Sequence, residues 1–203
     1  MSPRNPEKDR IARERRIEQI LDSALKVMAI KGFQPTSMQD IAKEADVSIG
    51  NVYHYFESKD EIFSEVLRRG QTNYGIHVTD ISKTTFPPLT KLTTICSSWL
   101  SIQTSWAFTI LMQSARLSDA TPNEIRRAVT DRFTTNLQPV ANIMRDGIED
   151  GTIIEGDPLQ LAFYFVSLIQ GLTLQRMPGY EVPIEMDVAA IIRLFEAKSS
   201  ASR

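Results

Sequence analysis

Residues 32–59, GFQPTSMQDIAKEADVSIGNVYHYFESK, decide how the N-terminal part of the chain folds. The stretch contains two short segments with helical patterning, Met38 to Ala45 and Ile49 to Phe56. Only the turn Asp46-Val47-Ser48 separates them. Two short helices joined by so tight a turn predict a helix-turn-helix.

The second of these helices has two unlike faces. Val52 and Phe56 lie four residues apart, so they share one face, and that face belongs in a core. Aromatic and small side chains on the opposite face suit entry into the major groove of DNA, where they can contact base edges. That opposite face carries Ile49, Gly50, Tyr53 and His54.

Serines precede three of the expected helices. Ser37, Ser48 and Ser58 each stand where a helix starts, and the free backbone N–H groups of a helix start favour phosphate oxygens. Ser37 with Asp40 also fits a capping box. Lys59 falls in the first turn of its helix, where the helix dipole prefers an anion, and a nearby phosphate would remove this conflict.

This stretch closely resembles the DNA-binding domain of TetR-type transcriptional regulators. The likeness rests on Gly-Phe, then Thr-Ser-Met-x-Asp-Ile-Ala, then Ala-x-Val-Ser-x-Gly-x-Val-Tyr-x-Tyr-Phe-x-x-Lys, and extends in detail over residues 10–70. It implies a homodimeric regulator, most often a repressor, that binds palindromic operator DNA and responds to a small apolar or amphipathic effector. By position it implies base contacts from Gln39, Ile49, Gly50, Tyr53 and His54, and phosphate contacts from Ser37, Ser48, Tyr55 and Lys59.

Asp46 departs from the family pattern, in which this turn position is commonly glycine because the chain there adopts positive φ. Aspartate tolerates that region better than most residues, at a cost of about 1 kcal/mol relative to glycine. We therefore expect a positive φ at Asp46, with no change of fold.

The rest of the chain predicts an all-α protein. Apolar residues at helical spacing from Ile17 to Met28 predict a first helix that Gly32 ends, preceded by a mobile tail over residues 1–9. We expect a three-helix helix-turn-helix domain over residues 10–57 and a helical effector-binding and dimerisation domain over residues 58–203. After a loop at Pro87-Pro88, further helices are expected over 89–117, 122–150, 158–177 and 187–197, with Pro139 either kinking or dividing the second.

Two sets of apolar residues in the C-terminal domain are candidates for function. Leu161 to Leu174 is apolar nearly all round, so it must be buried on more than one side. The resemblance implies that the last two helices form the subunit interface. The expected interface residues are Phe165, Leu168, Ile169, Leu172, Ile191 and Phe195. The candidates for an effector cavity are Trp99, Trp106, Phe108, Met112, Phe133, Met144 and Phe163, although each is equally suited to an ordinary core.

The net charge of the whole chain argues against DNA binding, but the charge of its separate segments does not. The 203 residues carry 23 Lys plus Arg against 25 Asp plus Glu, whereas nucleic-acid binders are typically basic. Residues 1–16, however, have a net charge of +3, and residues 71–203 have −2. Arg10, Arg13, Arg15 and Arg16 therefore predict a phosphate-contacting arm, which the dimer presents twice.

Several other classes of protein find no support in the sequence. Cys96 is the single cysteine and fits an inert core residue, and His54 and His77 are too far apart to suggest a metal site. There is no cofactor motif, no signal peptide and no stretch long enough to span a membrane, so we expect a cytoplasmic protein. Two alternatives stay open: a helix-turn-helix regulator that is constitutive or responds to a protein, and a small helical enzyme, for which no catalytic grouping is evident.

Overall fold

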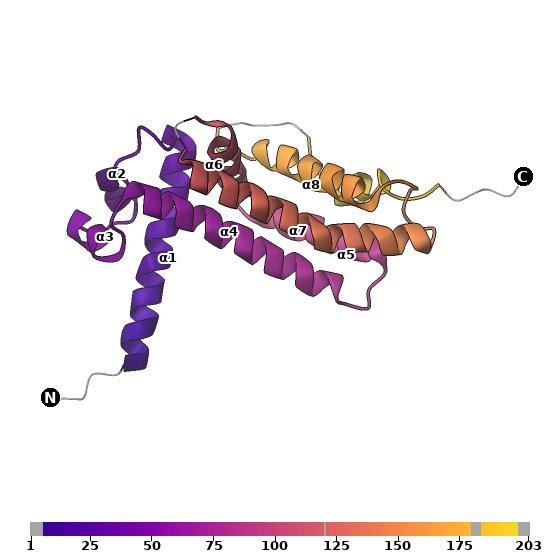
Figure 1. The fold of residues 1–203 in the computed structure, drawn as a ribbon, viewed down its shortest axis with the longest axis horizontal. Coiled ribbons are helices and arrows are strands. Elements are labelled where there is room, and N and C mark those ends of the chain that lie inside the picture. Colours follow the sequence, from indigo (N-terminus) through magenta and orange to yellow (C-terminus); the bar gives the residue numbers. More distant parts are fainter. Residues whose placement is uncertain (1–5, 120, 180–183, 199–203) are drawn as a thin grey trace, which may run out of the picture.

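The computed structural model describes residues 6–119, 121–179 and 184–198. Within these ranges the fold is all-α, as predicted, and one isolated β-bridge joins Ile153 to Glu196. The helices, labelled in Figure 1, are α1 (Pro6–Lys31), α2 (Met38–Glu44), α3 (Ile49–Tyr55), α4 (Lys59–Ser82), α5 (Pro88–Ser101), α6 (Ser105–Leu117), α7 (Asn123–Glu149), α8 (Pro158–Leu174) and α9 (Val188–Arg193).

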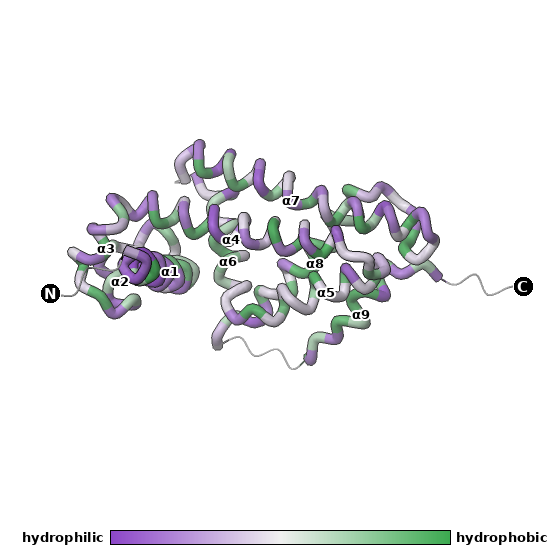
Figure 2. Tube along the Cα trace, turned by 90° about the horizontal axis from the view of Figure 1, so that it is seen from below, coloured by the Kyte–Doolittle hydropathy of each residue, from purple (hydrophilic) through white to green (hydrophobic). Residues whose placement is uncertain are grey.

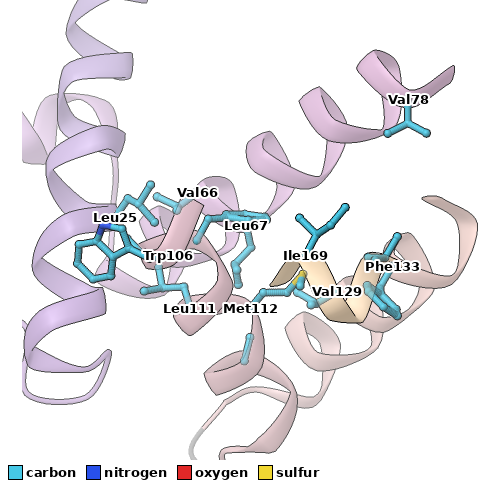
Figure 3. Close-up of a cluster of buried hydrophobic side chains, with 14 of the residues drawn as sticks. Leu25, Val66, Leu67, Val78, Trp106, Leu111, Met112, Val129, Phe133 and Ile169 are labelled. Carbon is cyan, nitrogen blue, oxygen red and sulfur yellow. The ribbon is translucent and has the colours of Figure 1, made fainter. Parts of the chain in front are cut away.

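The helix-turn-helix lies at one end of an elongated molecule. Figure 1 shows α2 and α3 beside α1 at this end, while α4 runs from there into the body formed by α5 to α8. One hydrophobic core continues across both parts. Figure 3 shows Leu25 of α1 and Val66 of α4 near Trp106 of α6, with the cluster extending to Ile169 of α8. The helix-turn-helix end is therefore packed directly onto the larger helical body.

Serine caps begin the three helices that the sequence marked. The Ser37, Ser48 and Ser58 side chains accept hydrogen bonds from the backbone N–H groups three residues on. Asp157 caps α8 in the same way, at Gln160. At the start of α7 the capping position is Pro122, and no side chain caps the helix.

Two helices expected in the C-terminal half differ in length. The single helix predicted over 89–117 is divided at Ile102–Thr104 into α5 and α6, although neither Gly nor Pro marks the break. The break lets α6 turn back against α1 and α8, which buries Trp106 and Leu111, so tertiary packing overrides the local helical pattern. The predicted 187–197 helix ends at Arg193, because the chain then turns extended to form the bridge at Glu196. In contrast, α7 passes through Pro139 as one helix.

The N-terminal end of α1 projects from the rest of the molecule. It is already helical from Pro6, so residues 6–9 of the predicted mobile tail are ordered, whereas residues 1–5 lie outside the described residues. Arg10 forms ion pairs with Glu7 and Glu14, each at 2.7 Å, which stabilise these first turns. Figure 2 shows this end of α1 to be hydrophilic. No helix of the described residues has the length and hydropathy to cross a membrane.

Candidate nucleic-acid interface and effector cavity

The two faces of α3 separate as the sequence pattern requires. Val52 is fully buried and Phe56, at the end of the helix, is 5% exposed. On the opposite face Tyr53 is 54% exposed and Ile49 39%, and a Cβ placed on Gly50 would meet no atom within 4 Å. His54 and, on α2, Gln39 are exposed as well. All five residues expected to face bases therefore lie on the surface.

The turn between α2 and α3 is held against α1. Asp46 has φ +51°, which confirms the predicted left-handed conformation. Next to it, Gln19 of α1 donates from Nε2 to the carbonyl oxygen of Ala45 at 2.6 Å. The backbone N–H of Val47 donates to Ala42 O at 3.0 Å. These bonds fix the angle at which α3 leaves the domain, so its exposed face is preorganised.

The side chains expected at phosphates differ in the contacts that they already make within the domain. Ser48 Oγ accepts from Asn51 N–H at 3.2 Å, which leaves its own hydroxyl proton for another acceptor. Ser37 Oγ instead donates to Asp40 Oδ2 at 2.7 Å. The Tyr55 ring is half-buried and lies under the guanidinium of Arg13, 5.4 Å from it. The Ser48 hydroxyl proton is thus available for a phosphate, whereas that of Ser37 is already donated to Asp40.

Lys59 also has partners inside the domain. Its Nζ donates to the carbonyl oxygen of Gln34 at 2.7 Å and lies 4.7 Å from the centre of the Phe33 ring. The positive charge at the start of α4 is therefore stabilised by a carbonyl dipole and an aromatic face. It remains half-exposed, and an ammonium group has three N–H donors, of which the contact with Gln34 uses one.

A second link ties the end of α1 to the start of α2. Lys31 forms an ion pair with Asp40, whose carboxylate also accepts from the Ser37 hydroxyl and backbone N–H. The hydrogen bond from Lys31 and those from Ser37 lower the pKa of Asp40 well below its ordinary value. The capping box of α2 is thus joined to an electrostatic contact with α1.

An apolar cavity, here called the inner cavity, lies between α4, α5, α6, α7 and α8. It is lined by Gln71, Tyr74, Trp99, Phe108, Met112, Phe133 and six further residues. Four expected effector-site residues, Trp99, Phe108, Met112 and Phe133, are thereby brought together. Its free volume is only about 30 Å³, so its own side chains nearly fill it.

Three other expected residues lie elsewhere. Trp106 is turned toward α1 by the break before α6, and Figure 3 shows its indole beside Leu25. Met144 is fully buried but does not line the inner cavity, and Phe163 is 44% exposed on α8. Periodicity places all three among apolar residues, but it does not say which helix each will face.

Sequence reasoning missed the polar residues of the inner cavity. Gln71, Asn136 and Gln170 line it, and Asn136 Nδ2 donates to the backbone oxygen of Gln71 at 2.8 Å. This contact needs Gly75, because a Cβ there would lie 2.5 Å from Asn136 Oδ1. A polar residue within an apolar helical stripe, as at Gln71, was the available signal.

The helix-turn-helix region matches a known protein family. The family described as "Bacterial regulatory proteins, tetR family" matches residues 20–66, which contain α2, α3 and the ends of α1 and α4 that hold them. The helix-turn-helix domain of the chain is therefore a TetR-family domain. The chain is a DNA-binding transcriptional regulator rather than an enzyme.

Relatives of this chain match it over most of its length. The "HTH-type transcriptional repressor KstR2" of Mycolicibacterium smegmatis is 28% identical over 154 residues, covering 74% of each chain. The structure of the "TetR Family Transcriptional Regulator PfmR" of Thermus thermophilus aligns at TM-score 0.68 with 22% identity, covering 86% of this chain and 93% of the other. That of AibR with isovaleryl coenzyme A and operator DNA aligns at 0.64 with 18% identity, covering 88% and 94%. At these identities the structural matches establish the fold alone.

The residues expected at a TetR-type subunit interface divide into two groups. Phe165, Ile169, Ile191 and Phe195 are at most 9% exposed within the single chain, so they have no surface to give to a partner. Ile191 and Phe195 pack inward because α9 contacts α5 and the segment after it forms the bridge to Ile153, Phe165 packs against Phe195, and Ile169 lines the inner cavity. Leu168 and Leu172 stay half-exposed. Tyr164, on the same face of α8, is 50% exposed, and Phe163, on a different side of the helix, is 44% exposed.

Cys96 and the acidic residues form no reactive site in the part of the chain that the structure describes. Cys96 is fully buried, and its burial raises the pKa of the thiol to about 11. No group of three or more His, Cys, Asp or Glu side chains among the described residues is placed to hold a metal ion.

Proposed function

We propose that this chain is a homodimeric repressor that binds a palindromic operator through α3 and leaves it when a small amphipathic effector enters the C-terminal domain. The observation that carries the DNA-binding part is the exposed face of α3. Tyr53, Ile49 and Gly50 have no function in the packing of the domain, yet they occupy a rigidly held helix at the tip of the molecule. Large exposed apolar and aromatic side chains in such a position are typical of a recognition surface.

In the proposed complex, α3 lies in the major groove. Tyr53 and His54 contact base edges, Ile49 meets a thymine methyl group, and Gly50 permits close approach of the helix to the base pairs. Gln39 reaches an adjacent base from α2. Ser48 and Lys59 bind phosphates, and the projecting part of α1 brings Arg13 and Arg15, both exposed, toward the DNA backbone.

The dimer is proposed to form through one face of α8. Tyr164, Leu168 and Leu172 form an apolar stripe at successive four-residue spacing, and a Cβ on Gly171, beside this stripe, would meet no atom within 4 Å. A helical glycine beside an open space costs about 1 kcal/mol relative to alanine, and close approach of a second helix would offset that cost. Two-fold symmetry about this face would present two α3 helices to the two halves of a palindrome.

The effector part is supported by the inner cavity. An apolar space with a few polar groups is the usual form of a small-molecule site, and opening it requires movement of flexible or aromatic side chains such as Met112 and Phe108. AibR, which shares this fold, is described in complex with isovaleryl coenzyme A and operator DNA, and that pairing supports a ligand-responsive regulator here. For this chain, α4 is the element that carries a change in the cavity to the DNA-binding end, since it contributes Gln71 at the cavity and Lys59 beside the loop of Gln34.

A mobility-shift titration tests the proposal. The full-length protein is titrated against the DNA upstream of its own gene and against a scrambled fragment of equal length and composition. We expect a complex with the upstream fragment that forms at least about a hundredfold more tightly, contains two protomers and protects two half-sites in footprinting. Equal affinity for both fragments would contradict sequence-specific binding. A one-protomer complex would contradict the dimer.

The alternative of a regulator without a small-molecule ligand is favoured by one observation, the small free volume of the inner cavity. Replacing Met112 with Trp, which fills the cavity, distinguishes this alternative from a ligand-responsive repressor. A ligand-responsive repressor so altered would stay on its operator under all conditions that release the wild type, whereas a constitutive one would be unchanged.

A further inference from the structure

The inner cavity opens into a wider space at the molecular surface. A cleft of about 610 Å³, here called the outer cleft, runs between α1, α4 and the α5–α6 connection. It shares Tyr74, Ile95, Trp99 and Phe108 with the inner cavity. The two spaces thus meet at a wall of aromatic rings, in which Tyr74 and Trp99 pack edge to face at 4.9 Å. A ligand that displaces this wall would occupy both.

Polar atoms without partners concentrate along this path. Five buried side-chain N or O atoms of the described residues have no hydrogen-bond partner, and three of them belong to residues that line the path. They are Gln71 Oε1 and Trp99 Nε1 at the inner cavity and Ser105 Oγ in the outer cleft. Because an unpaired buried polar group is costly, such a concentration indicates that another molecule supplies the missing partners.

The orientation of the Gln71 amide is fixed by its neighbour. Its Nε2 donates to the backbone oxygen of Val129 at 2.8 Å, and a carbonyl oxygen can accept from the amide nitrogen but cannot bond to the amide oxygen. The unpaired atom is therefore Oε1, a hydrogen-bond acceptor. Gln71 is 3% exposed, so bulk water does not satisfy it. It requires a donor from the ligand.

The charges along the path disfavour an anionic ligand. None of the described residues that line the inner cavity is charged. The outer cleft carries Glu18 and Asp22 on α1 against Arg69 on α4, and Arg69 is already paired with Asp22. A carboxylate or phosphate in the inner cavity would lose its hydration without a cation to replace it, and would enter past an unpaired carboxylate.

We propose, on the basis of the proposed effector function, that the ligand is an uncharged amphiphile with a hydroxyl group. The hydroxyl donates to Gln71 Oε1, an oxygen of the ligand accepts from Trp99 Nε1, and its hydrocarbon part displaces the aromatic wall toward the outer cleft. A hydroxyl is the smallest group that can both donate and accept, which suits a cavity of this size. An acid, an amine or a simple hydrocarbon each fails one of these requirements.

Four compounds with the same six-carbon chain test the ligand class: hexan-1-ol, its methyl ether, hexanoate and hexylammonium. Binding is followed by tryptophan fluorescence of full-length Trp106→Phe, in which Trp99 is the single remaining tryptophan. We expect hexan-1-ol to bind at least tenfold more tightly than each of the other three. Hexanoate or the ether binding as tightly as the alcohol would overturn the proposal, as would absence of a fluorescence change with hexan-1-ol up to its solubility limit.

A variant at Gln71 tests whether its Oε1 atom causes the preference for the alcohol over the ether. Gln71→Leu should reduce the ratio of alcohol to ether affinity to within about twofold of one, whereas Gln138→Leu, on the exposed side of α7, should leave it unchanged. Persistence of the tenfold preference in a folded Gln71→Leu protein would overturn the role of Gln71. If Gln71→Leu does not fold, the ranking of the four compounds on the parent protein decides.

The same compounds added to the mobility shift separate this inference from the proposed function. Tight binding of hexan-1-ol with no release of DNA would contradict the effector mechanism and leave the ligand class standing. Release by hexanoate alone would overturn the ligand class and leave the effector mechanism standing.

Discussion

The ammonium group of Lys59 donates a hydrogen bond to the main-chain oxygen of Gln34, so the first turn of α4 is fastened to the loop between α1 and α2. The sequence suggested a phosphate as the partner of this cation. The structure gives it a partner within the domain that leaves it half-exposed. Lys59 can therefore contact the loop and a phosphate at the same time. Its removal should affect DNA binding in a way that can be measured.

Lys59→Ala should weaken binding to operator and scrambled DNA alike, because a phosphate contact carries no sequence information. The slope of log affinity against log salt should fall by about 0.9 for each protomer. Mobility shifts at four salt concentrations measure both quantities. A loss confined to the operator would make Lys59 a specificity residue instead.

Tyr53→Ala should weaken operator binding by about 1–3 kcal/mol and leave non-specific binding unchanged. The side chain is 54% exposed, so its removal should not alter the melting temperature or the dimer. Competition titrations with operator and scrambled DNA measure the ratio of specific to non-specific affinity for each protein. As a control, Tyr55→Phe retains the ring that packs against Arg13 and should melt like the parent. Unchanged operator affinity in Tyr53→Ala would remove Tyr53 from the interface.

Asp46→Gly should leave the domain equally stable or stabilise it by up to about 1 kcal/mol, since φ +51° is strained for aspartate and free for glycine. Asp46→Ala keeps a Cβ without the polar group that helps aspartate adopt this conformation, so it should be less stable than the parent. Thermal melts of the three proteins provide the comparison. A clear drop in melting temperature for the glycine variant would show that the Asp46 side chain contributes more than the strain costs.

Tyr164→Arg should convert the proposed dimer to a monomer, because it places a charge on the apolar stripe of α8. The side chain is half-exposed in the single chain, so the monomer should keep its helical content. Sedimentation equilibrium measures the mass, and Gln138→Arg on the exposed face of α7 serves as control. A Tyr164→Arg protein that remains dimeric would place the interface elsewhere.

Asp40→Asn should lower stability at neutral pH and make little difference in acid. The folded-state pKa of Asp40 is held below its ordinary value, first by Lys31 and then by Ser37, so the contact stabilises the fold above the unfolded pKa of about 4 and is lost as the pH falls. Melting temperatures of parent and variant should therefore converge as the pH is lowered from about 6 to 3. Asp131→Asn, on the exposed side of α7, should show no such convergence. A constant difference across this range would mean that the Asp40 charge is not involved.

Much of the DNA-binding end could be predicted from sequence because its determinants are local. Ser48 caps α3 three residues ahead, Val52 and Phe56 share a face by helical spacing, and Asp46 occupies a turn whose conformation depends on its nearest neighbours. Each of these relationships lies within a few residues, so the linear pattern contains it. The exposed position of Tyr53 follows directly from them.

The C-terminal domain needed the tertiary structure because its relationships connect distant residues. The break at Ile102–Thr104 carries no local signal, yet it turns Trp106 toward α1. Gln71 meets Val129 and Asn136 only through the packing of α4 on α7. Likewise, Phe165 and Phe163 are both apolar residues of α8, and only the neighbouring helices decide that the first is buried and the second exposed. The sequence by itself therefore determined the helices and the recognition face, where short-range spacing governs, whereas the cavity and the free face of α8 depend on which helices pack together.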